Sequence, residues 1–227
     1  MAKRSYATVG FVALIVGLSM WAAGCADRLE PSHPKTYLEI DQVKEWSESH
    51  ASPYSIPERS MRAYAYAASK MSQEGCTLGW PTLAALGSVF SNHGFTHGSE
   101  IGENGVSTVP LRDLDLVKLN PVADTDQGRI DGNPEHDIPV GPFQIMPSRW
   151  EQFEKAVEPG TTANPDSIDD SALTVAHQLC IGGDLNGSEG WDTAIKNIDA
   201  DPEFVKKVHA KAKEYSCLLY TSPSPRD

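Results

Sequence analysis

The spacing of apolar positions predicts a body made mainly of helices. Apolar side chains recur at helical intervals from Pro57 to about Glu74, where Ser55 can cap the helix and Pro57 fits its first turn. A second, shorter helix begins at Pro81 and ends at Asn92, and its nearly uniform apolar or small residues predict that it is buried. Helical spacing returns in four later segments, residues 147–157, 167–180, 191–198 and 201–215.

Residues 95–140 interrupt this helical pattern. They are rich in Gly, Pro, Asn and Asp, and they alternate between apolar and polar positions only briefly, around Val106–Val117. So long a span without regular elements more often builds a site than serves as a plain loop. Because neither a βαβ alternation nor an internal repeat is present, we expect a mainly α fold with a loop-rich or small hairpin lobe.

The first 24 residues predict a secretory signal. Lys3 and Arg4 precede an uncharged stretch with an apolar centre at Val9–Val16 and small residues at its end. Cys25 directly follows Ala-Ala-Gly, as in a lipobox, so we expect Cys25 to be lipidated and to hold the protein on a membrane. The alternatives are an uncleaved signal anchor and ordinary cleavage that leaves a free thiol. All three place the body outside the cytoplasm.

Two further segments flank the domain that we expect at residues 55–216. Residues 25–54 are mostly polar, with one weakly apolar patch at Tyr37–Trp46 that is compatible with a short helix, and we interpret them as a tether with a docking segment. Residues 217–227 follow a helical segment without a helix-stop signal and resemble the translated adapter of a sequencing library. We therefore exclude them from the fold prediction.

Charge and cysteine content narrow the classes of partner and compartment. The 227 residues carry 19 Lys and Arg against 31 Asp and Glu, a net charge of −12, which argues against a nucleic-acid partner.

Of the four cysteines, Cys25 is assigned to lipid and Cys217 to the excluded tail. The remaining pair, Cys76 and Cys180, predicts a disulfide in an oxidising compartment. Two separate buried thiols are the alternative.

Three blocks of sequence are long and unusual enough to suggest a family. They are Ala84–Gly94, Asp124–Trp150 and Asn164–Gly183, and together they span most of residues 55–216. In content and order they resemble the secreted lytic murein transglycosylases. The resemblance implies a lysozyme-like α+β fold with a cleft, and the glycan strands of peptidoglycan as the ligand.

The chemistry of that family needs one carboxylic acid. The resemblance implies an acid that protonates the oxygen between N-acetylmuramic acid and N-acetylglucosamine. The same group then acts as a base while the C6 hydroxyl of the sugar closes a 1,6-anhydro ring. In the family this acid is the Glu before Ser-x-His-Gly, and here that position is Phe90. Because phenylalanine cannot transfer a proton, and loss of a positioned acid typically costs about 10²–10⁴-fold in rate, we expect impaired catalysis.

The resemblance also implies contacts to sugar around this position. A Tyr-Asn pair that lines the cleft in the family is replaced here by Ile198-Asp199. The expected substrate-binding residues are Ser91, His93, Phe143, Gln144 and Ile198.

Three acidic residues are candidates for a substitute acid. Asp199 introduces a carboxylate beside the expected cleft, and Glu100 and Glu103 lie in the loop that follows Phe90. Catalytic placement tolerates errors of only about 0.5 Å, so we rank a substitute acid below loss of the reaction.

We expect no cofactor and no metal. The run Asp124–Gly132 is similar to a calcium-binding loop, but it departs from the pattern at its fifth and sixth positions and has no Glu at the twelfth. Turn-forming Asp side chains are the better explanation of this run.

The leading hypothesis from the sequence is an envelope lipoprotein that binds peptidoglycan glycan strands without cleaving them efficiently. The first alternative is an active lytic transglycosylase that uses a substitute acid such as Asp199. The second alternative is an interaction module that has lost sugar binding and regulates a wall hydrolase as its partner.

Overall fold

The computed structural model describes residues 40–113, 121–181, 185 and 187–221 of the chain. Within these ranges it contains seven α-helices and one small antiparallel hairpin, which confirms the predicted mainly helical fold with a small hairpin lobe. The helices are α1 (Ile40–Ala51), α2 (Glu58–Gln73), α3 (Trp80–Ser91), α5 (Pro147–Phe153), α6 (Ile168–Ile181), α7 (Ser188–Ile198) and α8 (Pro202–Thr221). A 3₁₀ turn spans Ser52–Tyr54, and the hairpin pairs β1 (Val122–Ala123) with β2 (His136–Asp137).

Several helix ends differ from the predictions, and three of them are informative. Ser55 does not cap α2, because it adopts a left-handed conformation (φ 54°) and donates its amide to Ser52, while Pro57 occupies the cap position. Helix α5 ends at Phe153 rather than near residue 157, because the backbone becomes extended at Glu154. Helix α8 continues beyond residue 215 to Thr221.

The alternation expected around Val106–Val117 produces isolated bridges rather than strands. Val106 pairs with Ser167, and Arg112 pairs with Val140. Residues 114–120 lie outside the described ranges. The described part of this segment is therefore held by isolated bridges, some to distant loops and one between Ile101 and Ser107 within the segment.

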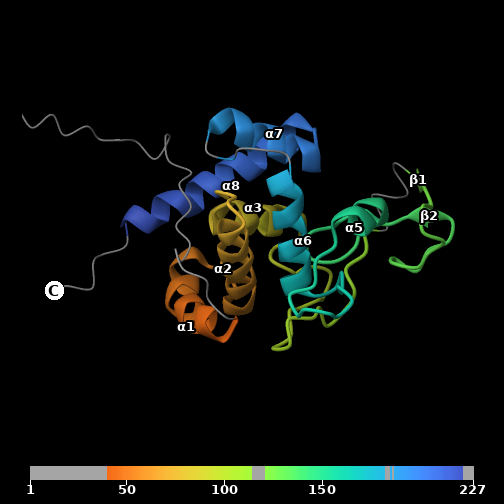
Figure 1. The fold of residues 1–227 in the computed structure, drawn as a ribbon, viewed down its shortest axis with the longest axis horizontal. Coiled ribbons are helices and arrows are strands. Elements are labelled where there is room, and N and C mark those ends of the chain that lie inside the picture. The colour runs from red at the N-terminus through yellow and green to blue at the C-terminus, as the bar shows by residue number, and fades with distance from the viewer. Residues whose placement is uncertain (1–39, 114–120, 182–184, 186, 222–227) are drawn as a thin grey trace, which may run out of the picture.

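Helices α2 and α3 form the centre of the core. Helix α2 packs against α1, α3 and α6, and α3 packs against α8, with α5 and the hairpin on the side away from α1 (Figure 1). Gly87 of α3 lets the two central helices approach, because a Cβ there would lie 2.2 Å from the Tyr64 hydroxyl of α2. As predicted, α3 is buried along most of its length.

The described part of the expected tether is folded onto the body. Helix α1 packs on α2, with Val43 fully buried and Trp46 against the core, and Tyr54 is buried in the turn that follows. The docking segment is therefore Ile40–Tyr54, longer than the apolar patch predicted. The expected signal, and Cys25 with it, lie outside the described residues.

A disulfide joins the two cysteines that the sequence analysis paired. Cys76, just after α2, is bonded to Cys180 in the last turn of α6, across a sequence separation of 104 residues. It links the beginning of the body to a helix that packs against α2.

None of the helices within the described ranges has both the length and the apolar character needed to cross a bilayer.

Two ion pairs fix the irregular lobe to the start of α6. The Arg59 guanidinium of α2 pairs with Asp169, and its Nε donates to the carbonyl of Glu103. Arg112 pairs with Asp166 at 2.7 Å. Both pairs are largely shielded from solvent, so they position the loop that carries residues 101–113.

Candidate functional site

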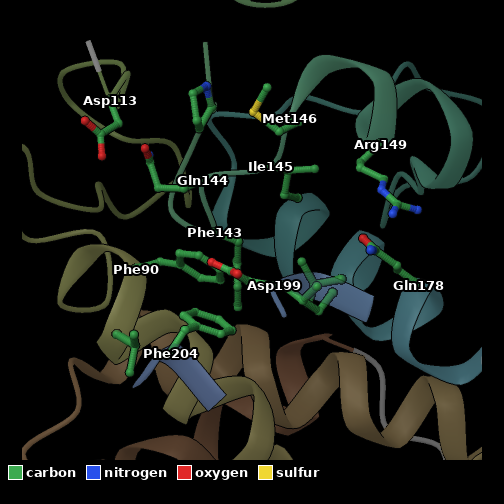
Figure 2. Close-up of a pocket in the computed structure, with 14 residues that line it drawn as sticks. Phe90, Asp113, Phe143, Gln144, Ile145, Met146, Arg149, Gln178, Asp199 and Phe204 are labelled. Atoms are coloured by element: carbon green, nitrogen blue, oxygen red, sulfur yellow. The ribbon is translucent and has the colours of Figure 1, made fainter. Parts of the chain in front are cut away.

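A pocket of about 320 Å³, called here the Phe90 pocket, opens where several parts of the chain meet. Its wall comes from the end of α3, the turn that follows Gly141-Pro142, helices α5 and α6, and the junction of α7 with α8 (Figure 2). Its volume lies at the low end of the range for small-ligand sites.

Five of the residues singled out in the sequence line this one pocket. They come from segments up to about a hundred positions apart and are Phe90, Phe143, Gln144, Ile198 and Asp199. The fold therefore brings together most of the positions that the resemblance assigned to a sugar cleft.

Aromatic rings form much of the pocket wall. The half-buried ring of Phe90, at the end of α3, lies 5.1 Å from the ring of Phe204 of α8, centre to centre, with 41° between the planes. Phe143 is almost fully buried and closes the wall behind them. The position expected to hold the acid is thus part of an aromatic surface, and aromatic surfaces provide large contact area for the apolar face of a ligand.

Gln144 projects from a turn whose shape depends on Gly141. Gly141 has φ 71°, and a Cβ there would lie 1.9 Å from the Pro165 carbonyl, so only glycine fits. Gln144 is itself left-handed (φ 48°), and its Nε2 donates to the Gly141 carbonyl at 2.7 Å. Its Oε1 is buried without a hydrogen-bond partner in the described part of the chain. A strained residue with an unpaired acceptor at a pocket wall is a feature typical of binding sites.

Ser91 is a structural residue rather than a sugar contact. Its buried hydroxyl donates to the Pro142 carbonyl at 2.6 Å and accepts from the Gly94 amide at 2.8 Å. Ser91 therefore ties the end of α3 to the turn before Gln144, and it does not line the pocket. The fold therefore does not bring Ser91 to the pocket with the other expected sugar contacts.

His93 is likewise buried in the core, and the fold does not bring it to the pocket where sugar contact was expected. It is 4% exposed, with Nδ1 3.1 Å from the Tyr64 hydroxyl and Nε2 3.2 Å from the Tyr215 hydroxyl. Burial, and then the charge of Lys211, lowers the pKa of His93 to about 4. The imidazole is therefore neutral near pH 7 and links α2 to α8.

Two carboxylates line the pocket. Asp199, the expected substitute acid, follows α7, is exposed, and accepts the Asp201 amide at 2.8 Å. Asp113 was not foreseen, because it lies in an irregular segment with no motif of its own. Glu100 and Glu103 are exposed and do not line the pocket.

Arg149 and Gln178 also line the pocket, and the sequence analysis gave neither a role. Figure 2 shows them on one side of the pocket, with Asp113 and Gln144 on the other. Arg149 belongs to the block that resembles the family signature, and its place one turn into the helix after Gln144 was the signal available. Gln178 had no such signal, because it lies within an ordinary helical repeat.

Three carboxylates gather elsewhere, at the hairpin. One oxygen from each of Asp124, Asp126 and Asp137 lies within 4.8 Å of the others. Their oxygens accept hydrogen bonds from nearby groups of the same lobe, for example Asp137 from the amide and hydroxyl of Thr125. Burial is the largest cause of the raised pKa of Asp126. The arrangement is that of turn-forming Asp side chains.

A larger hollow, of about 830 Å³, lies between α2 and the start of α6. Two of its carboxylates are already engaged, since Asp169 pairs with Arg59 and Asp170 accepts the amides of Val157 and Asn164, and the third, Glu158, is exposed to solvent. It holds none of the residues expected to bind sugar or to act as an acid.

The comparisons with known proteins add no family to this description. No family model, curated protein or solved structure matches the chain. The site is therefore interpreted from its own residues and from the resemblance of the three sequence blocks.

Proposed function

We propose that this chain is an extracytoplasmic protein that binds the glycan strands of peptidoglycan in the Phe90 pocket and cleaves them poorly or not at all. The proposal keeps the resemblance to secreted lytic murein transglycosylases as the source of the ligand. It assigns the present pocket to binding rather than to catalysis.

One observation carries the proposal. Phe90, Gln144 and Asp199, which the family signature marks separately in the sequence, line a single pocket. The rings of Phe90 and Phe204 offer a surface for the apolar face of a pyranose, while the half-buried amide side chain of Gln144 places a polar group at the same wall. A saccharide ring combines these two kinds of surface.

The loss of cleavage follows from the residue at position 90. The reaction of the family needs a proton donor at the end of α3, and the side chain there is a hydrocarbon ring packed on Phe204. Position 90 therefore supplies no acid to the glycosidic oxygen of a glycan bound on that ring. The bond is therefore left intact unless another acid reaches it.

Asp113 and Asp199 support a second candidate function, an active transglycosylase. Both line the pocket, so either carboxyl group is a candidate to protonate the glycosidic oxygen. The resulting carboxylate would then take the proton from the C6 hydroxyl that closes the anhydro ring. Analysis of the released products separates this candidate from a binding protein.

The proposed location is the cell envelope. The Cys76–Cys180 disulfide supports an oxidising compartment, and a lipidated Cys25 would anchor the chain to a membrane within reach of the wall. A binder of this kind would bring a partner wall enzyme to its substrate or keep it away.

Co-sedimentation with purified, insoluble peptidoglycan tests the binding. The protein should pellet with peptidoglycan, and Phe90→Asp, which puts a charge in place of the ring, should remain in the supernatant. The control is Val109→Asp, which puts the same charge on an exposed apolar side chain outside the pocket. Equal pelleting of the Phe90 variant and the natural protein would contradict a glycan site at this pocket.

A further inference from the structure

We infer that Arg149 and Gln178 form a carboxylate-binding subsite at one side of the Phe90 pocket. The inference rests on the proposed function and adds to it a class of substrate. The favoured ligand is glycan that carries a carboxylate next to the sugar ring held at Phe90.

Arg149 differs from the other arginines of the described ranges. Arg59 pairs with Asp169, Arg112 with Asp166, and Arg129 with Glu151. Arg62 has a buried, unpaired Nε and does not line the pocket.

Arg149 itself is exposed, lines the pocket, and has neither an ion pair nor a hydrogen bond from its guanidinium within the described part of the chain. Glu151, the nearest acid on the same helix, is already held by Arg129. The guanidinium is therefore free to bind an anion that enters the pocket.

Gln178 supplies a second polar group on the same side. It lies on α6, is half-buried, and its side chain makes no hydrogen bond to the residues that the structure describes. Figure 2 shows both side chains on the same side of the view, with the Arg149 guanidinium extending from α5 toward the amide of Gln178 on α6. A guanidinium presents parallel N–H groups that match a carboxylate, and an amide adds a further donor.

The charges around the pocket give a bound ligand one orientation. Asp113 and Gln144 lie across the pocket from Arg149, so that side favours hydroxyl or amide donors and repels an anion (Figure 2). Asp199 is exposed and already accepts an amide from Asp201. An anionic group is thus favoured only beside Arg149, with the sugar ring against Phe90 and Phe204.

Peptidoglycan glycan carries carboxylates from two sources. The lactyl ether of N-acetylmuramic acid ends in a free carboxyl group where no peptide is attached, and a stem peptide carries its own carboxyl groups where one is attached. Both project from the same ring position, so both are suited to a cation beside a bound sugar ring. A poly-N-acetylglucosamine chain carries neither.

Affinity measurements on three soluble oligosaccharides test the subsite. The ligands are a tetrasaccharide of N-acetylglucosamine, an alternating tetrasaccharide with free lactyl carboxyl groups, and the same alternating tetrasaccharide with stem peptides. The natural protein should bind at least one carboxylated ligand about tenfold more tightly than the neutral one. The better of the two carboxylated ligands identifies the source of the carboxylate.

Two variants and one control assign that preference to the subsite. Arg149→Gln should abolish the preference for the carboxylated ligands over the neutral tetrasaccharide. Gln178→Glu, which adds a repelling charge, should weaken only the carboxylated ligands. Lys155→Gln removes an exposed positive charge outside the pocket, six residues from Arg149, and should keep the full preference.

The outcomes separate the subsite from the proposed function. Equal affinity for all three ligands, or a preference that survives Arg149→Gln, would overturn the subsite while leaving glycan binding in place. Absence of binding to all three would overturn glycan binding, and the subsite with it.

Discussion

The ring of Phe90 packs against the ring of Phe204 with 5.1 Å between their centres, at the point where the end of α3 meets the start of α8. The two residues are 114 positions apart in the chain, so this contact joins the beginning and the end of the folded body. Under the proposed function, it also occupies the place where a transglycosylase would hold its acid. The same contact thus closes the fold and defines the chemistry available in the pocket.

Phe204→Leu should weaken glycan binding without unfolding the protein. Leucine keeps an apolar side chain at this buried position but removes the ring that orients Phe90, and aromatic pairs are worth about 0.5–1.5 kcal/mol beyond their burial. We expect an affinity loss of about threefold to tenfold by titration calorimetry. Phe95→Leu, at a half-buried position outside the pocket, is the matched control. If both variants lose affinity equally, the effect is not due to the Phe90 surface.

Stability should fall between pH 6.5 and pH 4 because of His93. Its pKa is lowered to about 4 in the folded protein, so the unfolded chain binds a proton in this window and the folded protein does not. The free energy of unfolding should therefore decrease by roughly 3 kcal/mol as the pH falls through this range.

Urea unfolding of a variant at several pH values isolates this contribution. His93→Gln keeps a polar group between Tyr64 and Tyr215 but removes the titration, so its stability should depend less on pH than that of the natural protein. The exposed His97→Gln is the control and should follow the natural protein. An unchanged pH dependence in His93→Gln would refute the assignment.

Gly87→Ala should destabilise the fold although alanine favours helices. The added Cβ would lie 2.2 Å from the Tyr64 hydroxyl and 2.9 Å from its Cζ, so α2 and α3 must separate or the ring must shift. We expect the free energy of unfolding to fall by about 1–3 kcal/mol, whereas the higher helix propensity of alanine alone would raise it by up to about 1 kcal/mol. Urea denaturation distinguishes the two signs. Adding Tyr64→Phe, which removes the closer of these two atoms, should recover part of the loss.

Removal of the disulfide should lower stability through the unfolded chain. Replacing Cys76 and Cys180 together by serine frees a loop of about a hundred residues, for which a typical cost is about 2–4 kcal/mol. Denaturant midpoints of this double variant and of Cys217→Ser, which leaves the disulfide intact, measure the difference. Equal midpoints would show that the bond contributes little to the stability of the fold.

The sequence predicted which segments form helices better than it predicted the residues at which those helices begin and end. Apolar spacing located α2, α3 and α6 because each buries a continuous stripe or most of its surface. It misplaced the cap of α2, since the 3₁₀ turn before that helix draws Ser55 into a left-handed conformation. Turn geometry of this kind depends on tertiary packing and leaves little trace in a pattern of apolar residues.

The sequence predicted those pocket residues that belong to a recognisable motif. It missed those that only tertiary contacts bring to the pocket. Successive residues of a helix point about 100° apart. Because the side chain of Phe90 faces the pocket, the side chain of the next residue, Ser91, points elsewhere, toward Pro142. Asp113 reaches the pocket from a loop beside the Arg112–Asp166 pair, a contact between residues 54 positions apart that no local pattern encodes.

Product analysis of digested peptidoglycan tests the central claim most directly. Purified peptidoglycan is incubated with the natural protein, with Phe90→Glu and with Phe90→Gln as the uncharged control, and released fragments are examined by mass spectrometry. A binding pocket that lacks its acid predicts no 1,6-anhydromuramyl products from the natural protein or from Phe90→Gln, and their appearance with Phe90→Glu. Release of these products by the natural protein would contradict the account and direct the search for the acid to Asp113 and Asp199.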